Sequence, residues 1–81
     1  MTAEQILKDL EEIFRDNFDD DELELTRETT ADDIEDWDSL EHITLIGAVE
    51  RAFKMKFKMG EISSMKNVGE MAAIIQSRTK L

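Results

Sequence analysis

The chain has 81 residues and contains neither cysteine nor proline. A chain of this length holds one small domain, so we predict a single domain over residues 1–81. The absence of cysteine excludes disulfides, thiolate catalysis and cysteine metal sites. No apolar run approaches the roughly 18 residues of a membrane span, and the N-terminus lacks the basic start and apolar core of a signal peptide. We therefore expect a cytoplasmic monomer that does not insert into membranes.

The formal net charge is −10, and the charges are unevenly distributed. Residues 1–50 contain 18 acidic and 3 basic side chains, whereas residues 51–81 contain 2 acidic and 7 basic ones. The acidic part repels nucleic acid phosphates, so we expect no nucleic acid binding. It also attracts partners with basic patches by long-range steering. Far from the central helix, we favour the simpler interpretation that the acidity maintains solubility.

The first predicted helix begins near Thr2, whose hydroxyl is placed to cap it while Gln5 reaches back in a Thr-x-x-Gln capping box. An apolar stripe at helical spacing then follows the helix, which is predicted to end near Asn17. Such a stripe is usually core. Its members are Ile6, Leu7, Leu10, Ile13, Phe14 and Phe18.

Residues 19–38 are rich in Asp, Glu and Thr without a sustained period, which predicts a long loop with one short helical turn at 30–33. The carboxylates at 19–22 do not have EF-hand spacing, because no register places Gly sixth and Glu twelfth. A weak adventitious cation site is the most that they allow. Four apolar residues can anchor the loop to the core, namely Leu23, Leu25, Ile34 and Trp37.

A central helix is predicted to start at Ser39. Asp38 has the chemistry of an N-cap, and Glu41 three residues later completes an Asp-x-x-Glu capping box. The Ser39 hydroxyl then lies beside unpaired backbone N–H groups at the positive end of the helix dipole. A phosphate ester there is favoured by roughly 0.3 to 1 kcal/mol. The position suits attachment of a phosphate better than a nucleophile.

Drawn as a wheel, this helix has two different sides. The predicted buried stripe contains His42, Leu45, Ile46, Val49, Ala52 and Phe53. Leu40 points almost the opposite way, on one side with Thr44, Gly47 and Arg51. A lone exposed leucine often has no role, because much of any protein surface is apolar. The sharper alternative is a docking contact for proteins that must reach Ser39.

After the central helix comes a short basic segment, residues 54–60, in which Phe57 is expected to plug the core. Its lysines form either an ordinary solvated face or a contact for an acidic partner or a phosphate. A brief helix is predicted at 61–64. Four methionines, Met55, Met59, Met65 and Met71, would make the core adaptable, although methionine more often simply fills gaps.

The last helix is predicted to begin after Asn67, which has N-cap chemistry, with Glu70 at the third helical position. Its buried side should contain Val68, Met71, Ile74 and Ile75. The predicted fold class is thus all-α, a small antiparallel four-helix bundle of three longer helices and one short one.

Catalysis by this chain is not expected. His42 is the only histidine, and its wheel position puts it at the edge of the buried stripe rather than beside the Ser39 hydroxyl. We expect it to be a structural, hydrogen-bonded residue. A triad needs the imidazole within hydrogen-bond reach of the serine, which residues three apart on one helix do not readily provide. No metal-ligand cluster or phosphate-binding glycine loop is present in the sequence.

The segment from Asp38, Ser39 and Leu40 to Ile46 resembles the attachment motif of acyl carrier proteins, the phosphopantetheine-binding family. The similarity continues through residues 49–53, 56–57 and 65–71 and covers nearly the whole chain. In that family the serine of an Asp-Ser-Leu triplet opens the second helix of a four-helix bundle. Two departures lie away from the triplet: Lys54 stands where the family often has Gly, and the proline usual shortly afterward is absent.

The resemblance implies 4'-phosphopantetheine as a covalent cofactor on Ser39, flanked by Asp38 and Leu40. It implies a carrier that holds acyl or related intermediates as thioesters for fatty acid, polyketide or related biosynthesis. The implied partners are a phosphopantetheinyl transferase and acyl-loading, condensing or transferring enzymes with basic docking patches. An alternative is an unmodified helical interaction module that docks basic partners through Leu40 and the acidic surface. The expected partner-binding residues are Leu40, Glu41, Thr44, Gly47, Glu50 and Arg51.

Overall fold

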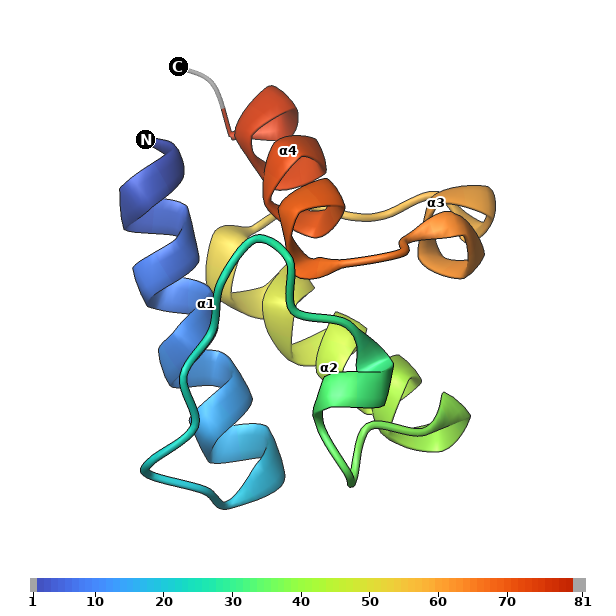
Figure 1. The fold of residues 1–81 in the computed structure, drawn as a ribbon. Helices are drawn as coiled ribbons and strands as arrows, with labels where there is room; N and C mark the ends of the chain where they lie inside the picture. The colour runs from blue at the N-terminus through green and yellow to red at the C-terminus, as the bar shows by residue number, and fades with distance from the viewer. Residues whose placement is uncertain (1, 80–81) are drawn as a thin grey trace.

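The computed structural model describes residues 2–79, which fold into four α-helices and one 3₁₀ turn (Figure 1). The elements are α1 (Ala3–Phe18), η1 (Ala31–Asp33), α2 (Ser39–Phe53), α3 (Met59–Ser64) and α4 (Val68–Arg78). Helix α1 packs against both α2 and α4. The short α3 comes between α2 and α4 in the chain and lies at the side of the bundle (Figure 1). The predicted all-α fold with one short helix is confirmed.

Helix α1 begins and ends as its local sequence dictates. The Thr2 hydroxyl accepts from the Gln5 N–H at 3.1 Å, so the predicted cap is confirmed. The second half of the capping box is wrong, because the Gln5 side chain donates forward to Asp9 at 3.0 Å. The helix ends at Asp19, a left-handed residue with φ 51° whose N–H bonds to the Arg15 carbonyl.

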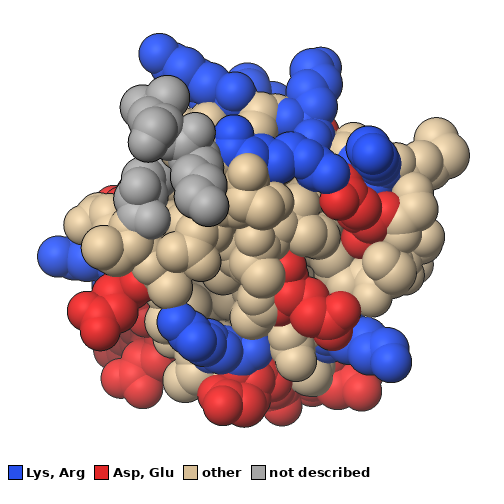
Figure 2. Space-filling view, turned by 90° about the horizontal axis from the view of Figure 1, so that it is seen from above, with Lys and Arg blue, Asp and Glu red and all other residues tan. Residues whose placement is uncertain are grey.

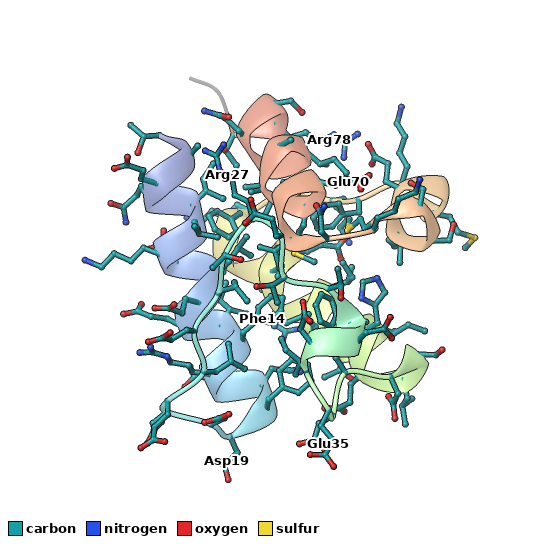
Figure 3. All side chains as sticks on the ribbon, in the orientation of Figure 1. Phe14, Asp19, Arg27, Glu35, Glu70 and Arg78 are labelled. Carbon is teal, nitrogen blue, oxygen red and sulfur yellow. The ribbon has the colours of Figure 1, made fainter. Side chains whose placement is uncertain are left out.

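The core lies where α1, α2 and α4 meet, and Phe14 occupies its centre (Figure 3). The predicted stripes of the three longer helices supply most of it. Two expectations are wrong: Ala52 is exposed, and Met59 is 86% exposed rather than part of the core. The buried apolar residues are Ile6, Leu10, Phe14, Leu23, Leu25, Trp37, Leu45, Ile46, Val49, Phe53, Met55, Phe57, Val68, Met71, Ala72 and Ile75.

The long loop is pinned along its length. Leu23, Leu25 and Trp37 are buried, and Ile34 packs half-buried against them, so all four predicted anchors are confirmed. Helix α1 also holds the loop backbone through polar side chains. Arg15 donates from Nε to the Leu23 carbonyl at 2.8 Å, and the Leu25 N–H donates to the Glu11 carboxylate at 2.9 Å.

The loop also completes the start of α4. The first N–H groups of a helix have no partner within it. Here the Val68 N–H donates to the Thr29 carbonyl at 2.9 Å, and the Gly69 N–H donates to the Arg27 carbonyl at 2.8 Å. A Cβ at Gly69 would lie 3.0 Å from that same Arg27 oxygen. The close approach of the loop therefore favours glycine at this position, because a larger residue would push the Arg27 carbonyl away.

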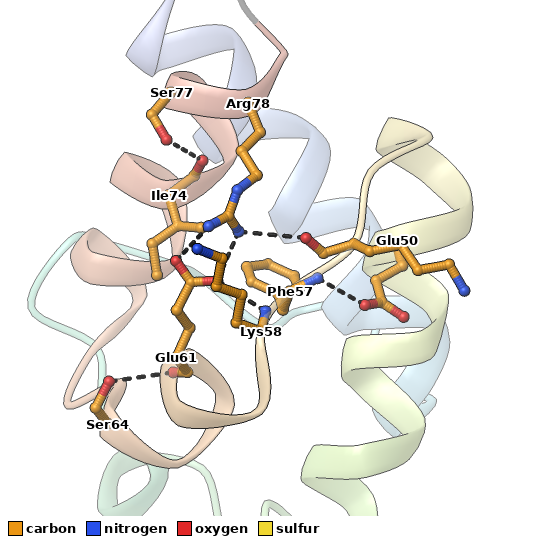
Figure 4. Close-up of polar contacts among 9 residues, drawn as sticks. Glu50, Phe57, Lys58, Glu61, Ser64, Ile74, Ser77 and Arg78 are labelled. Atoms are coloured by element: carbon orange, nitrogen blue, oxygen red, sulfur yellow. Dashed lines mark hydrogen bonds and ion pairs between the residues drawn. The ribbon is translucent and has the colours of Figure 1, made fainter.

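The connection from α2 to α3 is held by acidic side chains (Figure 4). The Phe57 N–H donates to the Glu50 carboxylate at 2.8 Å, and the buried Phe57 ring plugs the core as predicted. Glu61 accepts from the Lys58 N–H at 2.8 Å and pairs with both terminal nitrogens of Arg78 at 2.6 and 2.5 Å. The hydrogen bond from Arg78, with that from Lys58, lowers the pKa of Glu61 to about 2.

Candidate functional site

Ser39 is the first residue of α2 and is exposed to solvent. The preceding Asp38 is extended, and its carboxylate accepts from the Glu41 N–H at 2.8 Å, so the predicted N-cap is confirmed. The second half of the predicted capping box is wrong. The Asp38 N–H donates to the Asp36 carbonyl at 3.1 Å and not to the Glu41 side chain. The serine hydroxyl thus stands free of the cap at the positive end of α2.

An apolar surface lies next to Ser39. Leu40 is 73% exposed, as its place on the helical wheel predicts, and Ile43 is 67% exposed. The sequence reasoning missed Ile43. The sequence spacing could have predicted its position, because Ile43 follows Ser39 by four residues and so lies one helical turn further along the same side of α2. Thr44 is also exposed, and its hydroxyl donates to the Leu40 carbonyl at 3.3 Å.

The other expected partner-binding residues on α2 differ in how far they are exposed to solvent. Glu41 is half-buried at the start of α2, and Arg51 is exposed near its end. The guanidinium of Arg51 lies over Gly47, with Nη1 3.5 Å from where a Cβ of that residue would be. Glu50 is half-buried and holds the Phe57 N–H. Its carboxylate therefore has a structural role, whatever it contributes to docking.

The basic segment forms a surface separate from the acidic start of α2. Lys54, Lys56 and Lys58 are exposed. A hollow of about 410 Å³ lies between the segment 54–56 and the last turns of α2. Figure 2 shows the end of the bundle where α1 begins and α4 ends, with lysine and arginine gathered mainly along one edge and carboxylates along the opposite one. The uneven charge along the sequence is thus also uneven in space.

A cavity of about 500 Å³ opens beside Ser39. It lies between the start of α2, the η1 turn, α3 and the start of α4. Most of its lining surface is apolar. The lining residues are Ala31, Trp37, Asp38, Ser39, His42, Ile43, Ile62, Ser63, Met65, Lys66, Asn67 and Met71.

His42 forms part of the wall of this cavity through two hydrogen bonds. The indole N–H of Trp37 donates to its Nδ1 at 3.0 Å, and its Nε2 lies 3.0 Å from the Ile62 carbonyl. The prediction of a hydrogen-bonded structural histidine is confirmed. Trp37 was expected only as an apolar anchor, and sequence reasoning missed its bond to His42. The sequence pattern gave little indication of this bond. Trp37 lies in the loop and His42 in the helix, so their separation of five residues does not fix the distance between their side chains.

Residues 2–79 contain neither a cluster suited to a metal ion nor a helix suited to crossing a membrane. No group of three or more His, Asp or Glu side chains in that range is arranged to hold a metal ion. Within the same residues, no helix has the length and apolar character that a membrane span requires.

No family model and no curated protein matches the chain. Among solved structures, it is similar to the solution NMR structure of the holo acyl carrier protein from Geobacter metallireducens. The two chains are 49% identical, the match covers 89% of this chain and 83% of the other, and the TM-score is 0.84. At that identity and coverage, the chain belongs to the acyl carrier protein family.

Membership of this family defines the chain as a carrier protein rather than an enzyme. In the fold, the exposed Ser39 opens α2, and His42 is hydrogen-bonded to Trp37 and Ile62.

Proposed function

We propose that Ser39 carries 4'-phosphopantetheine and that the protein delivers acyl or related intermediates to enzymes of fatty acid, polyketide or related biosynthesis. The observation that carries the proposal is the exposed Ser39 hydroxyl at the first position of α2, directly after the Asp38 cap. When bound, the arm supplies a thiol that holds the cargo as a thioester. The carrier itself raises the effective concentration of cargo at each docked enzyme.

The residues around Ser39 fit a phosphate ester. The carboxylate of Asp38 is turned toward the Glu41 N–H, so its charge is offset by the helix that it caps. The exposed first position leaves room for a transferase, and the helix dipole favours the phosphate. The adjoining cavity of about 500 Å³, with its largely apolar lining, is of a suitable kind for an acyl chain between visits to enzymes.

The partners that fit this site have an apolar pocket ringed by basic side chains. Leu40 and Ile43 present an apolar contact within one turn of Ser39. Asp36, Asp38 and Glu41 surround the same route with negative charge. Such charges accelerate encounter with a basic surface, and the apolar contact then lengthens the life of the complex. A phosphopantetheinyl transferase is the first such partner.

The test is the intact mass of the protein after incubation with coenzyme A and a broad-specificity phosphopantetheinyl transferase. We expect one phosphopantetheine increment in the wild type and none in Ser39→Ala. Ser63→Ala is the matched control, because Ser63 is an exposed serine on the rim of the same cavity and should leave the increment intact. No increment on the wild type with several transferases would favour the unmodified interaction module instead.

A further inference from the structure

Helix α3 is a wall of the cavity with little apolar attachment of its own. It has six residues, all within the described part of the chain, and none of them is buried. Ile62 and Ser63 line the cavity, and Ile62 packs only half-buried against the core. A helix this short is not stable by itself, so its position depends on the bonds made to it.

Within residues 2–79, two polar attachments hold α3 in place. At its start, Glu61 binds Arg78 of α4 and the Lys58 N–H. At its middle, the Ile62 carbonyl receives His42 of α2 at 3.0 Å. Only the second attachment spans the cavity, because His42 and Ile62 both line it while Glu61 and Arg78 lie outside it.

The chemistry of His42 fixes the direction of its two bonds. An indole N–H is a donor only, so Nδ1 of His42 must accept from Trp37. The ring proton of the neutral imidazole is then on Nε2, which donates to the Ile62 carbonyl, an acceptor only. The chain of bonds runs in one direction, from Trp37 through His42 to Ile62.

Trp37 fixes one end of this chain to the core. Its side chain is buried, and its ring meets Phe14 edge-on, with ring centroids 5.1 Å apart. The imidazole also packs against the indole, at a centroid distance of 5.7 Å. His42 is therefore held firmly on the side of Trp37, and the movable partner is α3.

We propose that His42 is the latch that holds α3 against α2 and so sets how far the cavity beside Ser39 opens to cargo. It is a positioning residue that acts through the Ile62 carbonyl. That the cavity receives cargo rests on the proposed function, whereas the hold on α3 does not. Breaking the bonds of His42 frees the wall formed by α3, and a cargo chain is then less well enclosed.

The test of the latch is amide hydrogen exchange of the unmodified protein, so it is decided even if Ser39 is never modified. His42→Leu replaces the imidazole by an apolar side chain of similar size, which cannot form either hydrogen bond. We expect the exchange of the Ile62 and Ser63 amides to become about tenfold faster, with α1 and α4 unchanged. His42→Gln has both an amide oxygen and an N–H group and should restore most of the protection.

Leu10→Ala is the control for a general loss of stability, because Leu10 is fully buried in α1 and has no part in the latch. It should accelerate exchange throughout the bundle. Any of three results would overturn the proposal. The exchange rates of the α3 amides could be unchanged in His42→Leu, they could rise no more than those of α1 and α4, or they could remain high in His42→Gln.

A second measurement reads the cavity itself. An octanoyl thioester is loaded on the Ser39 arm, and its cleavage by hydroxylamine is timed in each variant. We expect cleavage to be several-fold faster in His42→Leu than in the wild type and close to the wild type in His42→Gln, because an unlatched α3 encloses the chain less. Equal cleavage rates in all three proteins would mean that the latch does not control access to cargo.

Discussion

Arg78 at the end of α4 donates from both terminal nitrogens to the carboxylate of Glu61 in α3, at 2.6 and 2.5 Å. The pair joins residues 17 positions apart, and Arg78 also donates to the Lys56 carbonyl at 3.2 Å. Two-pronged contacts of this kind are the strongest and best oriented of the ion pairs. One arginine therefore fixes both the start of α3 and the connection before it.

The Glu61–Arg78 pair predicts how stability depends on pH. Its hydrogen bonds lower the pKa of Glu61 from 4.5 to about 2, so the folded state holds this proton less tightly than the unfolded chain. The stabilisation is fully present above about pH 4.5 and is lost as the pH falls through about 2. Glu61→Gln should therefore be less stable than the wild type at neutral pH, and the gap should close between these pH values.

Urea denaturation of both proteins at steps between pH 6 and 2 measures this gap. Glu12→Gln is the control, because Glu12 is an exposed carboxylate of α1. A gap between wild type and Glu61→Gln that stays constant with pH would mean that the charge of Glu61 does not stabilise the fold.

Truncation to alanine should reduce stability at Leu45 and slow modification at Leu40. Leu45 is fully buried, so Leu45→Ala should cost about 2 to 5 kcal/mol of unfolding free energy. Leu40→Ala should change it by less than about 0.5 kcal/mol, as for other surface positions, while slowing modification of Ser39. Chemical denaturation and the rate of the mass increment separate the two effects. Unchanged modification of Leu40→Ala would remove Leu40 from the docking surface.

Lys54 occupies a backbone conformation that suits glycine. It ends α2 in the left-handed region with φ 55°, where a Cβ is strained. Lys54→Gly should raise the unfolding free energy by about 0.5 to 1 kcal/mol, since the relief of strain exceeds the added entropy of the unfolded chain. Lys54→Ala removes the same charge and keeps the Cβ, so it should give no such gain. Thermal or urea unfolding of the three proteins compares them directly, and equal stability of the Gly and Ala variants would contradict the strain.

Capture by the transferase should depend on salt. Raising the salt from 0.1 to 1 M shortens the screening length from about 10 to about 3 Å, which removes most long-range attraction. Glu41→Lys beside Ser39 should slow association in stopped-flow measurements more than Glu12→Lys on α1, although the change in net charge is the same. Glu50→Lys is a poorer test, because it also breaks the bond to the Phe57 N–H. If neither salt nor Glu41→Lys changed the association rate, the acidic side chains would serve solubility alone.

Local chemistry made much of this structure predictable. The caps at Thr2, Asp38 and Asn67 follow from side chains that reach an N–H three residues ahead. The exposure of Leu40 and the burial of Leu45 follow from a single helical period. Such features depend on neighbours along the chain, which the sequence displays.

The errors arose where several partners compete or distant segments meet. Gln5 has both Thr2 and Asp9 within reach, and the sequence does not say which it takes. Ala52 keeps the helical period but is exposed near the end of α2, because none of the segments within residues 2–79 buries it there. The bond between His42 and Ile62 joins residues 20 positions apart and requires the position of α3, which no local pattern supplies.

The loop that completes the start of α4 also sets where this domain can be lengthened. Near Asp21 the chain is exposed, and its bonds are those of a local turn. A longer loop costs little entropy, so a peptide tag inserted after Asp21 should leave the bundle folded. The same tag after Arg27 would pull apart the two carbonyls that hold the Val68 and Gly69 N–H groups. Lengthening is thus tolerated in the first part of the loop and excluded from the second, although both look alike in composition.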